Sequence, residues 1–141
     1  MGSEVDAGRS LSLVDVDSDG DIDLLVGNYS HTNKLYRNDG KGGFDATGTD
    51  ISGIGTADSS QHVSLGDMDG DGDYDLLLSH SSRAIHALEN TGDSSGPAWT
   101  RKSAWDLASA ATATAPSKMS FGALDVDGVP EALIGGNYSA G

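Results

Sequence analysis

The chain carries the nonapeptide Asp15-Val16-Asp17-Ser18-Asp19-Gly20-Asp21-Ile22-Asp23, in which five aspartates alternate with other residues. A second copy, Asp67-Met68-Asp69-Gly70-Asp71-Gly72-Asp73-Tyr74-Asp75, follows 52 residues later. Carboxylates held this close repel one another unless a cation lies between them. All the ligands on offer are oxygens, and calcium accepts six to eight oxygens in flexible geometry, whereas magnesium requires an octahedron. The two nonapeptides therefore predict two calcium ions per chain.

Each position of the nonapeptide has an expected role in binding the metal. The side chains at positions 1, 3 and 5 can converge where the backbone curls, and the glycine at position 6 permits the sharp turn that follows. Position 7 is expected to supply its backbone carbonyl oxygen, and position 9 a closing carboxylate. The predicted ligands are Asp15, Asp17, Asp19, Asp21 and Asp23 in the first loop and Asp67, Asp69, Asp71, Asp73 and Asp75 in the second.

The helix-loop-helix calcium hand shares the opening of this motif but does not fit the rest of it. That hand requires a bidentate glutamate at position 12, where this chain has Val26 and Leu78. The residues on both sides of each loop form short apolar runs of strand length, with glycine nearby. The loops are therefore expected to join β-strands.

An apolar strand, an aspartate-rich nonapeptide and a second apolar strand that reaches Gly27-Asn28 resemble the FG-GAP/VCBS repeat family. This resemblance implies β-propeller blades, each a four-stranded antiparallel sheet, as in integrin α-subunit heads and many secreted bacterial proteins. It also implies that the loop joins the first two strands of a blade and binds calcium there. The composition agrees with an all-β fold, because 20 glycines and 36% hydrophobic residues favour short strands and many turns.

The chain is expected to hold about two and a half such repeats. A lead-in at 1–9 is followed by a first repeat at 10–60, a second repeat with a connecting segment at 61–118, and a partial third repeat at 119–141. The strands are expected at 11–16, 22–29, 33–37 and 44–51, then at 61–66, 74–80, 83–89 and around Trp99, and finally from Met119 and at 132–138. The turns between the third and fourth strands also recur 52 residues apart, which indicates a true repeat.

The third repeat contains a degenerate loop with Asp125, Asp127 and Glu131. When Asp125 is aligned with Asp67, the loop lacks two residues of the nonapeptide, including the aspartate of position 5. The ring of carboxylates is then incomplete. We expect this loop to bind metal weakly or not at all.

Charge and composition exclude several classes of function. The formal net charge is −14, from 22 acidic and 8 basic residues, which repels nucleic acid and anionic membranes. The chain has no cysteine, so it has neither disulfides nor thiolate metal sites. No apolar run reaches membrane-spanning length, and the N-terminal residues show no hydrophobic signal segment. An extracellular or secreted location is expected from the calcium loops and from the resemblance.

Two and a half repeats are too few to close a propeller, which needs roughly four to eight blades. An open array exposes sheet edges and apolar faces, so we expect self-association into a homo-oligomer, a dimer or a trimer. A piece of a longer propeller and an engineered assembly unit are the alternatives.

We expect a calcium-binding module for adhesion, recognition or scaffolding, with a glycan or protein as its ligand and no catalytic residues. The histidines His31, His62, His80 and His86 have no metal-binding spacing, and surface or packing roles are expected for them. The alternative is an enzyme, a lyase or hydrolase acting on polysaccharide, because some propellers carry such chemistry. Another alternative is a structural piece whose only ligand is calcium.

Overall fold

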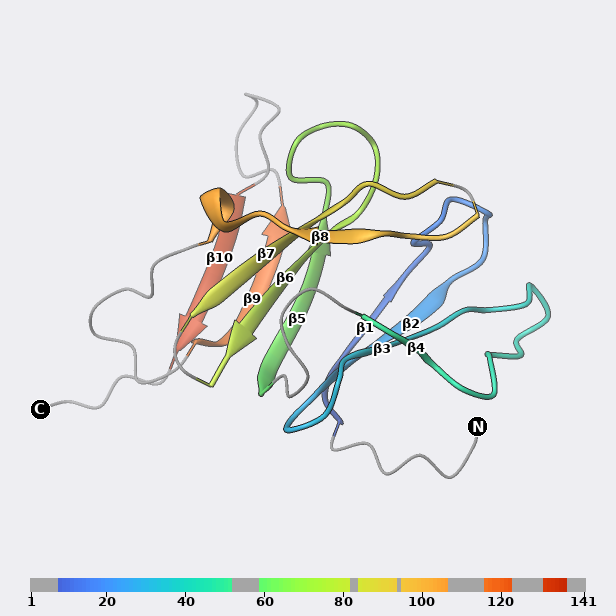
Figure 1. The fold of residues 1–141 in the computed structure, drawn as a ribbon, viewed down its shortest axis with the longest axis horizontal. Helices are drawn as coiled ribbons and strands as arrows, with labels where there is room; N and C mark the ends of the chain where they lie inside the picture. The colour runs from blue at the N-terminus through green and yellow to red at the C-terminus, as the bar shows by residue number, and fades with distance from the viewer. Residues whose placement is uncertain are drawn as a thin grey trace, which may run out of the picture.

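In the computed structural model the chain is almost entirely β-structure (Figure 1). The structure describes residues 8–51, 59–81, 84–93, 95–106, 116–122 and 131–136. Within these residues the strands form two four-stranded antiparallel sheets and one two-stranded hairpin. The expected all-β fold of four-stranded antiparallel sheets is confirmed.

The first sheet has the strand order β1-β2-β3-β4, so each strand pairs with its neighbour in the sequence. Its strands are β1 (Gly8–Val14), β2 (Asp23–Asn28), β3 (Lys34–Tyr36) and β4 (Thr49–Asp50). The fourth strand is shorter than the expected 44–51, because the chain bends after a single bridge between Phe44 and Asn38 and pairs again only at Thr49. The first nonapeptide is the loop between β1 and β2.

The second sheet repeats this order as β5-β6-β7-β8, and the hairpin pairs β9 with β10. These strands are β5 (Ser60–Gly66), β6 (Asp75–His80), β7 (Ile85–Asn90), β8 (Trp99–Arg101), β9 (Pro116–Gly122) and β10 (Glu131–Gly136), and a short 3-10 helix, η1 (Ser103–Trp105), follows β8. The second nonapeptide is the loop between β5 and β6. In Figure 1, β10 lies at the left flank of the molecule, and the first sheet lies at the opposite side.

The strand register corrects the expected alignment of the third loop. Gly122 pairs with Glu131, just as Val14 pairs with Asp23 and Gly66 with Asp75, so the two paired residues are nine positions apart in all three hairpins. The third loop therefore has the same length as the other two and lacks no residues. Counted back from Glu131 at position 9, Asp125 and Asp127 take positions 3 and 5, and an alanine takes position 1. Residues 123–130 themselves lie outside the described residues.

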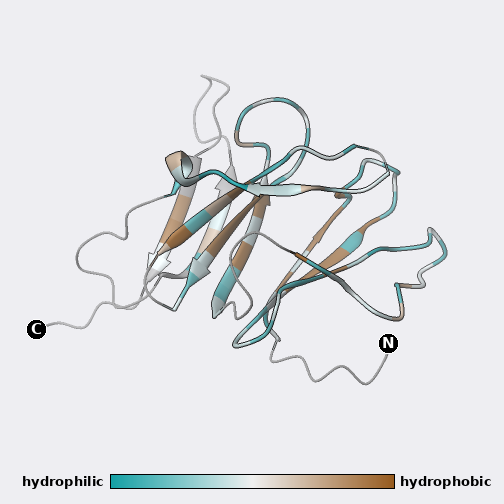
Figure 2. Ribbon diagram, in the orientation of Figure 1, coloured by the Kyte–Doolittle hydropathy of each residue, from teal (hydrophilic) through white to brown (hydrophobic). Residues whose placement is uncertain are grey.

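A first hydrophobic core lies between the two four-stranded sheets. The first sheet and the loops around it contribute Val16, Leu25, Leu35 and Ile51, and the second sheet contributes Val63, Leu76, Leu78 and Leu88. Strand β5 contacts both β1 and β2, and the main-chain N–H of Val63 donates to the Ser10 hydroxyl at 3.2 Å. In Figure 2 the brown segments lie mostly in the strands, whereas the turns are mostly teal or white.

A second core covers the opposite face of the second sheet. Leu77, Ile85 and Ala87 pack there against Met119 of β9, with Met68 and Trp105 at the margin. Strand β9 contacts β5 and β6, so β1, β5 and β9 follow one another in space as they do along the chain. Each sheet thus packs its face against the next one, as consecutive propeller-type blades do.

The contact between the blades leaves no room for a side chain at Gly27. A Cβ at this position would lie 2.7 Å from a Cγ atom of Val63, which is 1% exposed and β-branched and therefore cannot move aside. The equivalent position in the third hairpin, Gly135, would meet Lys118 only at ordinary contact distance, 3.9 Å.

We predict that Gly27→Ala lowers the free energy of unfolding by about 1–3 kcal/mol through overpacking, measured by urea denaturation. At protein concentrations where the chain is monomeric, Gly135→Ala is the matched control and is expected to change it by less than about 0.5 kcal/mol. Equal losses in both variants would show that the cost comes from the strand backbone and not from the contact between blades.

Candidate metal centres

The first loop is folded around the carboxylate of Asp15. Its two oxygens accept the main-chain N–H groups of Asp19 at 3.1 Å and Gly20 at 2.9 Å. Gly20 has φ +95°, a left-handed conformation that glycine adopts at no steric cost, as the position 6 role requires. The Asp15 side chain thus curls the backbone back on itself, and the following aspartates turn inward.

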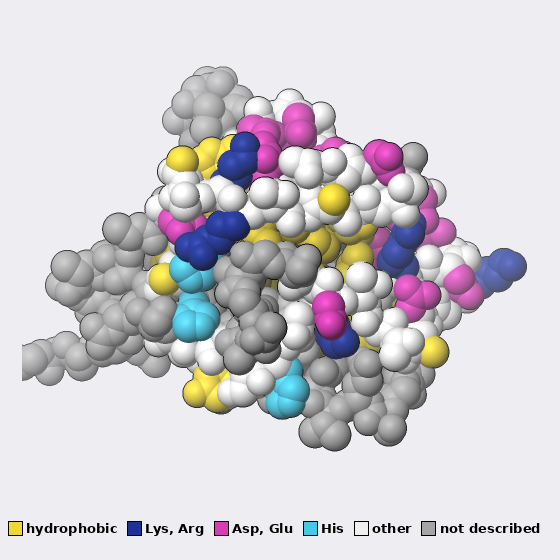
Figure 3. Space-filling model, viewed as in Figure 1, with side chains coloured by type: hydrophobic (Ala, Val, Ile, Leu, Met, Phe, Trp, Pro, Cys, Tyr) yellow, Lys and Arg dark blue, Asp and Glu magenta, His cyan; other side chains and the backbone are white. Residues whose placement is uncertain are grey.

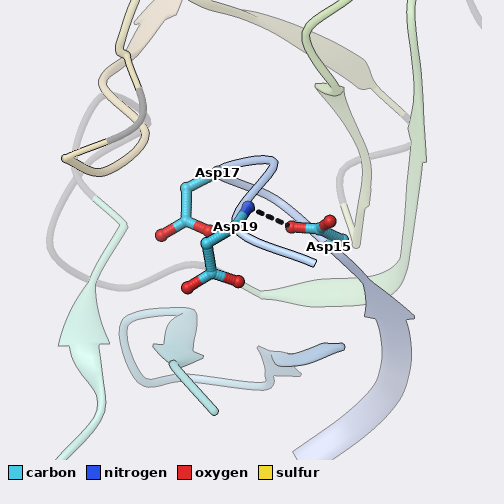
Figure 4. A group of neighbouring side chains, drawn as sticks. All are labelled: Asp15, Asp17 and Asp19. Atoms are coloured by element: carbon cyan, nitrogen blue, oxygen red, sulfur yellow. Dashed lines mark hydrogen bonds between the residues drawn. The ribbon is translucent and has the colours of Figure 1, made fainter. Parts of the chain in front are cut away.

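This curl brings three carboxylates together (Figure 4). Asp15, Asp17 and Asp19 each offer an oxygen, and these oxygens lie within 4.8 Å of one another. Each ionised carboxylate has about four lone-pair sites, so the hydrogen bonds within the loop leave acceptors free for a cation. A set of hard oxygen donors at this separation could bind a metal ion.

Asp17 is the buried member of the cluster. Its side chain is fully buried, and one carboxylate oxygen, Oδ2, pairs with the guanidinium of Arg37. The other, Oδ1, has no hydrogen-bond partner among the residues that the structure describes. A buried carboxylate oxygen without a partner is costly, and a cation at the cluster would satisfy it.

The second loop repeats the fold of the first. The Asp67 carboxylate accepts the N–H groups of Gly70 at 2.7 Å and Gly72 at 3.0 Å, and Gly72 has φ +97°. Asp67, Asp69 and Asp71 bring three oxygens within 4.8 Å of one another. In Figure 3, acidic side chains gather over both loops along one edge of the molecule. The two candidate centres therefore lie on the same edge.

The position 9 aspartates, Asp23 and Asp75, are almost completely buried and hold the backbone. Asp23 accepts N–H groups from Val16 at 3.2 Å and Asn38 at 2.8 Å. In the second blade, Asp75 makes the equivalent bonds to Met68 and Asn90, both at 2.8 Å. Each of these carboxylates thus ties its own loop to the end of the third strand of its blade.

Burial raises the pKa of both Asp23 and Asp75, the backbone hydrogen bonds lower it, and the neighbouring loop aspartates raise it further. Asp23 and Asp75 do not belong to the clusters of three oxygens. Asp21 and Asp73 do not belong to them either; their main-chain N–H groups donate to the side chains of Asp19 and Asp71. The metal-binding role of these four residues remains a prediction. The sequence analysis did not predict that Asp23 and Asp75 hold the backbone. Their partners Asn38 and Asn90 lie 52 residues apart, as the two aspartates do, and this shared spacing was the signal in the sequence.

Arg37 is a further residue of the first centre that the sequence analysis missed. Besides its contact with Asp17, it donates to the main-chain carbonyl of Ser95 at 3.0 Å, and so it links the first loop to the second blade. The strand pairing places Glu89 at the equivalent position of the second blade, where it pairs with Lys102 at 2.7 Å. The first centre therefore has a basic side chain, Arg37, beside it, whereas the second has an acidic side chain, Glu89, at the equivalent position.

A cleft of about 370 Å³ lies beside Arg37, between the first sheet and the β7–β8 turn. Leu35, Ile51 and Trp99 supply its apolar wall. The Trp99 side chain also packs against the first core. Among the described residues, the indole N–H of Trp99 has no acceptor.

Asp125 and Asp127, which the sequence analysis assigns to the loop of the third repeat, lie outside the described residues. Elsewhere in the part of the chain that the structure describes, no other group of three histidine or acidic side chains comes close enough to share a metal ion. His86 does not take part in such a group; it lies beside Arg101 and Asp106, and burial is the largest of the effects that lower its pKa.

No helix among the described residues is long and apolar enough to cross a membrane.

Comparison with known proteins supports the resemblance found in the sequence. Residues 15–78 match the family model of the FG-GAP-like repeat. The match begins at the first residue of the first loop and ends in β6, so it contains both candidate centres. No curated protein matches the chain. The resemblance to the FG-GAP repeat family is thus confirmed for this stretch.

We predict that Asp75→Ala lowers the free energy of unfolding by about 2–4 kcal/mol in EGTA, because two main-chain N–H groups lose their acceptor. Chemical denaturation without calcium separates this loss from any contribution of a bound ion. The control is Asp73→Ala in the same loop, for which a change below about 0.5 kcal/mol is expected. Similar stability of the two variants would contradict the role assigned to Asp75.

Proposed function

We propose that these FG-GAP-like repeats bind two calcium ions through the β1–β2 and β5–β6 loops. The ions are structural, and each holds together the first two strands of its blade. The module itself acts outside the cell by binding a protein or glycan or by serving as a scaffold, and it is not an enzyme.

The observation that carries this proposal is the buried carboxylate of Asp17. Its Oδ1 faces no partner among the described residues, although it belongs to a cluster with Asp15 and Asp19. Arg37 neutralises one side of this carboxylate and leaves the other in need of a cation. The second loop contains an equivalent cluster, so the convergence of three carboxylates is a repeated feature of the blades and not a chance arrangement.

The chemistry of the donors favours calcium over other ions. Both clusters consist of carboxylates alone, without the histidine or cysteine that zinc and copper prefer. The loops are turns of irregular backbone, which suit the variable coordination of calcium better than the strict octahedron of magnesium. Ten of the 22 acidic residues lie in the two nonapeptides, so two bound ions would relieve the densest negative charge of the chain.

The extracellular role is supported by the same loops. Extracellular calcium modules bind at roughly 10⁻⁴–10⁻³ M, a range in which the ion saturates sites outside cells but not inside them. FG-GAP repeats are also typical of extracellular proteins. A protein or glycan ligand would then contact loops that calcium keeps in one conformation.

We expect calcium to raise the thermal unfolding temperature and EGTA to reverse the increase. At a free concentration 100 times the dissociation constant, each site contributes about 2.7 kcal/mol. Isothermal titration calorimetry should give two ions per chain, and Asp67→Asn should reduce the number to one. Equal stability in calcium and EGTA, with no heat of binding, would overturn the proposal.

The two sites are expected to differ because the positive charge of Arg37, paired with one oxygen of Asp17, opposes a calcium ion bound to the other oxygen. We predict that Arg37→Gln raises the affinity of the first site about three- to tenfold, after allowance for the partial exposure of this charged pair. The matched control is Lys102→Gln, which removes the cation paired with Glu89 in the second blade and should leave the affinity of the first site unchanged. Weaker binding in Arg37→Gln would mean that Arg37 organises the loop and does not oppose the ion.

A further inference from the structure

Each blade has two apolar faces, which the strand register identifies. Cross-strand partners lie on the same face of a sheet, so Leu11 lies on one face of the first sheet with its partner Val26, and Leu25 lies on the other with Ser12. We call the face toward the preceding blade the head face and the face toward the following blade the tail face.

The chain already makes the same interface twice. In the first core, the tail face of the first blade, with Leu25, meets the head face of the second, with Val63. In the second core, the tail face of the second blade, with Leu77, meets Met119 on the head face of the β9–β10 hairpin. Leu25 and Leu77 are equivalent in register, as are Val63 and Met119.

The head face of the first blade has no such neighbour within the described residues. Leu11 takes the place of Val63 in the register, yet it is 68% exposed, whereas Val63 is 1% exposed. Leu13, equivalent to the half-buried Leu65, is 66% exposed. Both are large apolar side chains on a strand, and Leu11 occupies the position at which the next two repeats bury Val63 and Met119.

The tail face of the β9–β10 hairpin is exposed in the same way. Leu133 is equivalent to Leu25 and Leu77, which are 0% and 1% exposed, but it is itself 58% exposed. Its cross-strand partner, Ser120, is also exposed. Figure 1 places β10 at the flank of the molecule, away from the first blade.

We propose that the exposed head face of one copy packs against the exposed tail face of a second copy. Leu11 and Leu13 of the first copy then pack against Leu133 of the second, as Val63 and Leu65 pack into the core that contains Leu25 within one chain. The two free faces are the two halves of an interface that the chain builds twice, so the assembly continues the packing already present within one chain. Exposed apolar patches of this kind mark association surfaces.

The association is head to tail and therefore heterologous, because two different faces meet. Such contacts close into a ring when the rotation between copies permits it and otherwise extend into a filament. The free faces are formed by strands and not by the calcium loops. Failure of this proposal is therefore distinguishable from failure of the calcium proposal.

The test uses the full chain and three single variants. Leu11→Glu places a charge on the head face, Leu133→Glu on the tail face, and Thr100→Glu on the exposed outer strand β8 as the matched control. Sedimentation equilibrium over a concentration series should give assemblies of several 14.4 kDa chains for the wild type and for Thr100→Glu. Leu11→Glu and Leu133→Glu should each sediment as monomers with circular dichroism unchanged, because both side chains are exposed within the chain.

Mixing the two monomeric variants gives the sharper result. Leu11→Glu keeps its tail face and Leu133→Glu keeps its head face, so an equimolar mixture should form a 1:1 dimer of about twice 14.4 kDa. A pairing of identical faces would not give this rescue. A wild type that stays monomeric at every concentration would overturn the proposal, as would a mixture of the two variants that stays monomeric.

Discussion

The hydrogen bonds of the buried aspartates Asp23 and Asp75 are the constraint on which the rest of each blade depends. Each carboxylate begins a second strand and accepts one N–H from the loop before it and one from the end of the third strand. A single side chain thus fixes the loop, the register of the first hairpin and the end of the third strand. Within the loop held in this way, Asp15 and Asp67 curl the backbone and bring the three carboxylates of each cluster together.

Much of this could be predicted from the sequence, because the deciding features are local. Aspartates alternating with small residues, and glycine at position 6, define a turn whose conformation depends on residues only a few positions apart. Short apolar runs on both sides predicted the strands, and the repeat at 52 residues predicted two similar sheets. The ends of strands were less certain, as the two-residue β4 (Thr49–Asp50) shows, since pairing at a sheet edge depends on tertiary packing.

Two features could not be read from the same pattern. The contact of Arg37 with Asp17 joins residues 20 positions apart, and a sequence does not show which way a side chain at a strand end points. The third loop was misaligned because the alignment was anchored on its aspartates. The strands gave the better anchor, since Val63-Ser64-Leu65-Gly66 in β5 corresponds to Met119-Ser120-Phe121-Gly122 in β9.

The two cores lie between the sheets and not inside them, and this has a consequence for how the molecule opens. A repeat that buries its side chains only against its neighbours is stabilised by those neighbours, so local stability varies with the number of interfaces a blade shares. The second blade takes part in both cores, whereas the first blade and the β9–β10 hairpin each take part in one. In a single chain, opening should therefore begin at the two flanks and reach β6 last, so that the second blade is the part that holds the other two together.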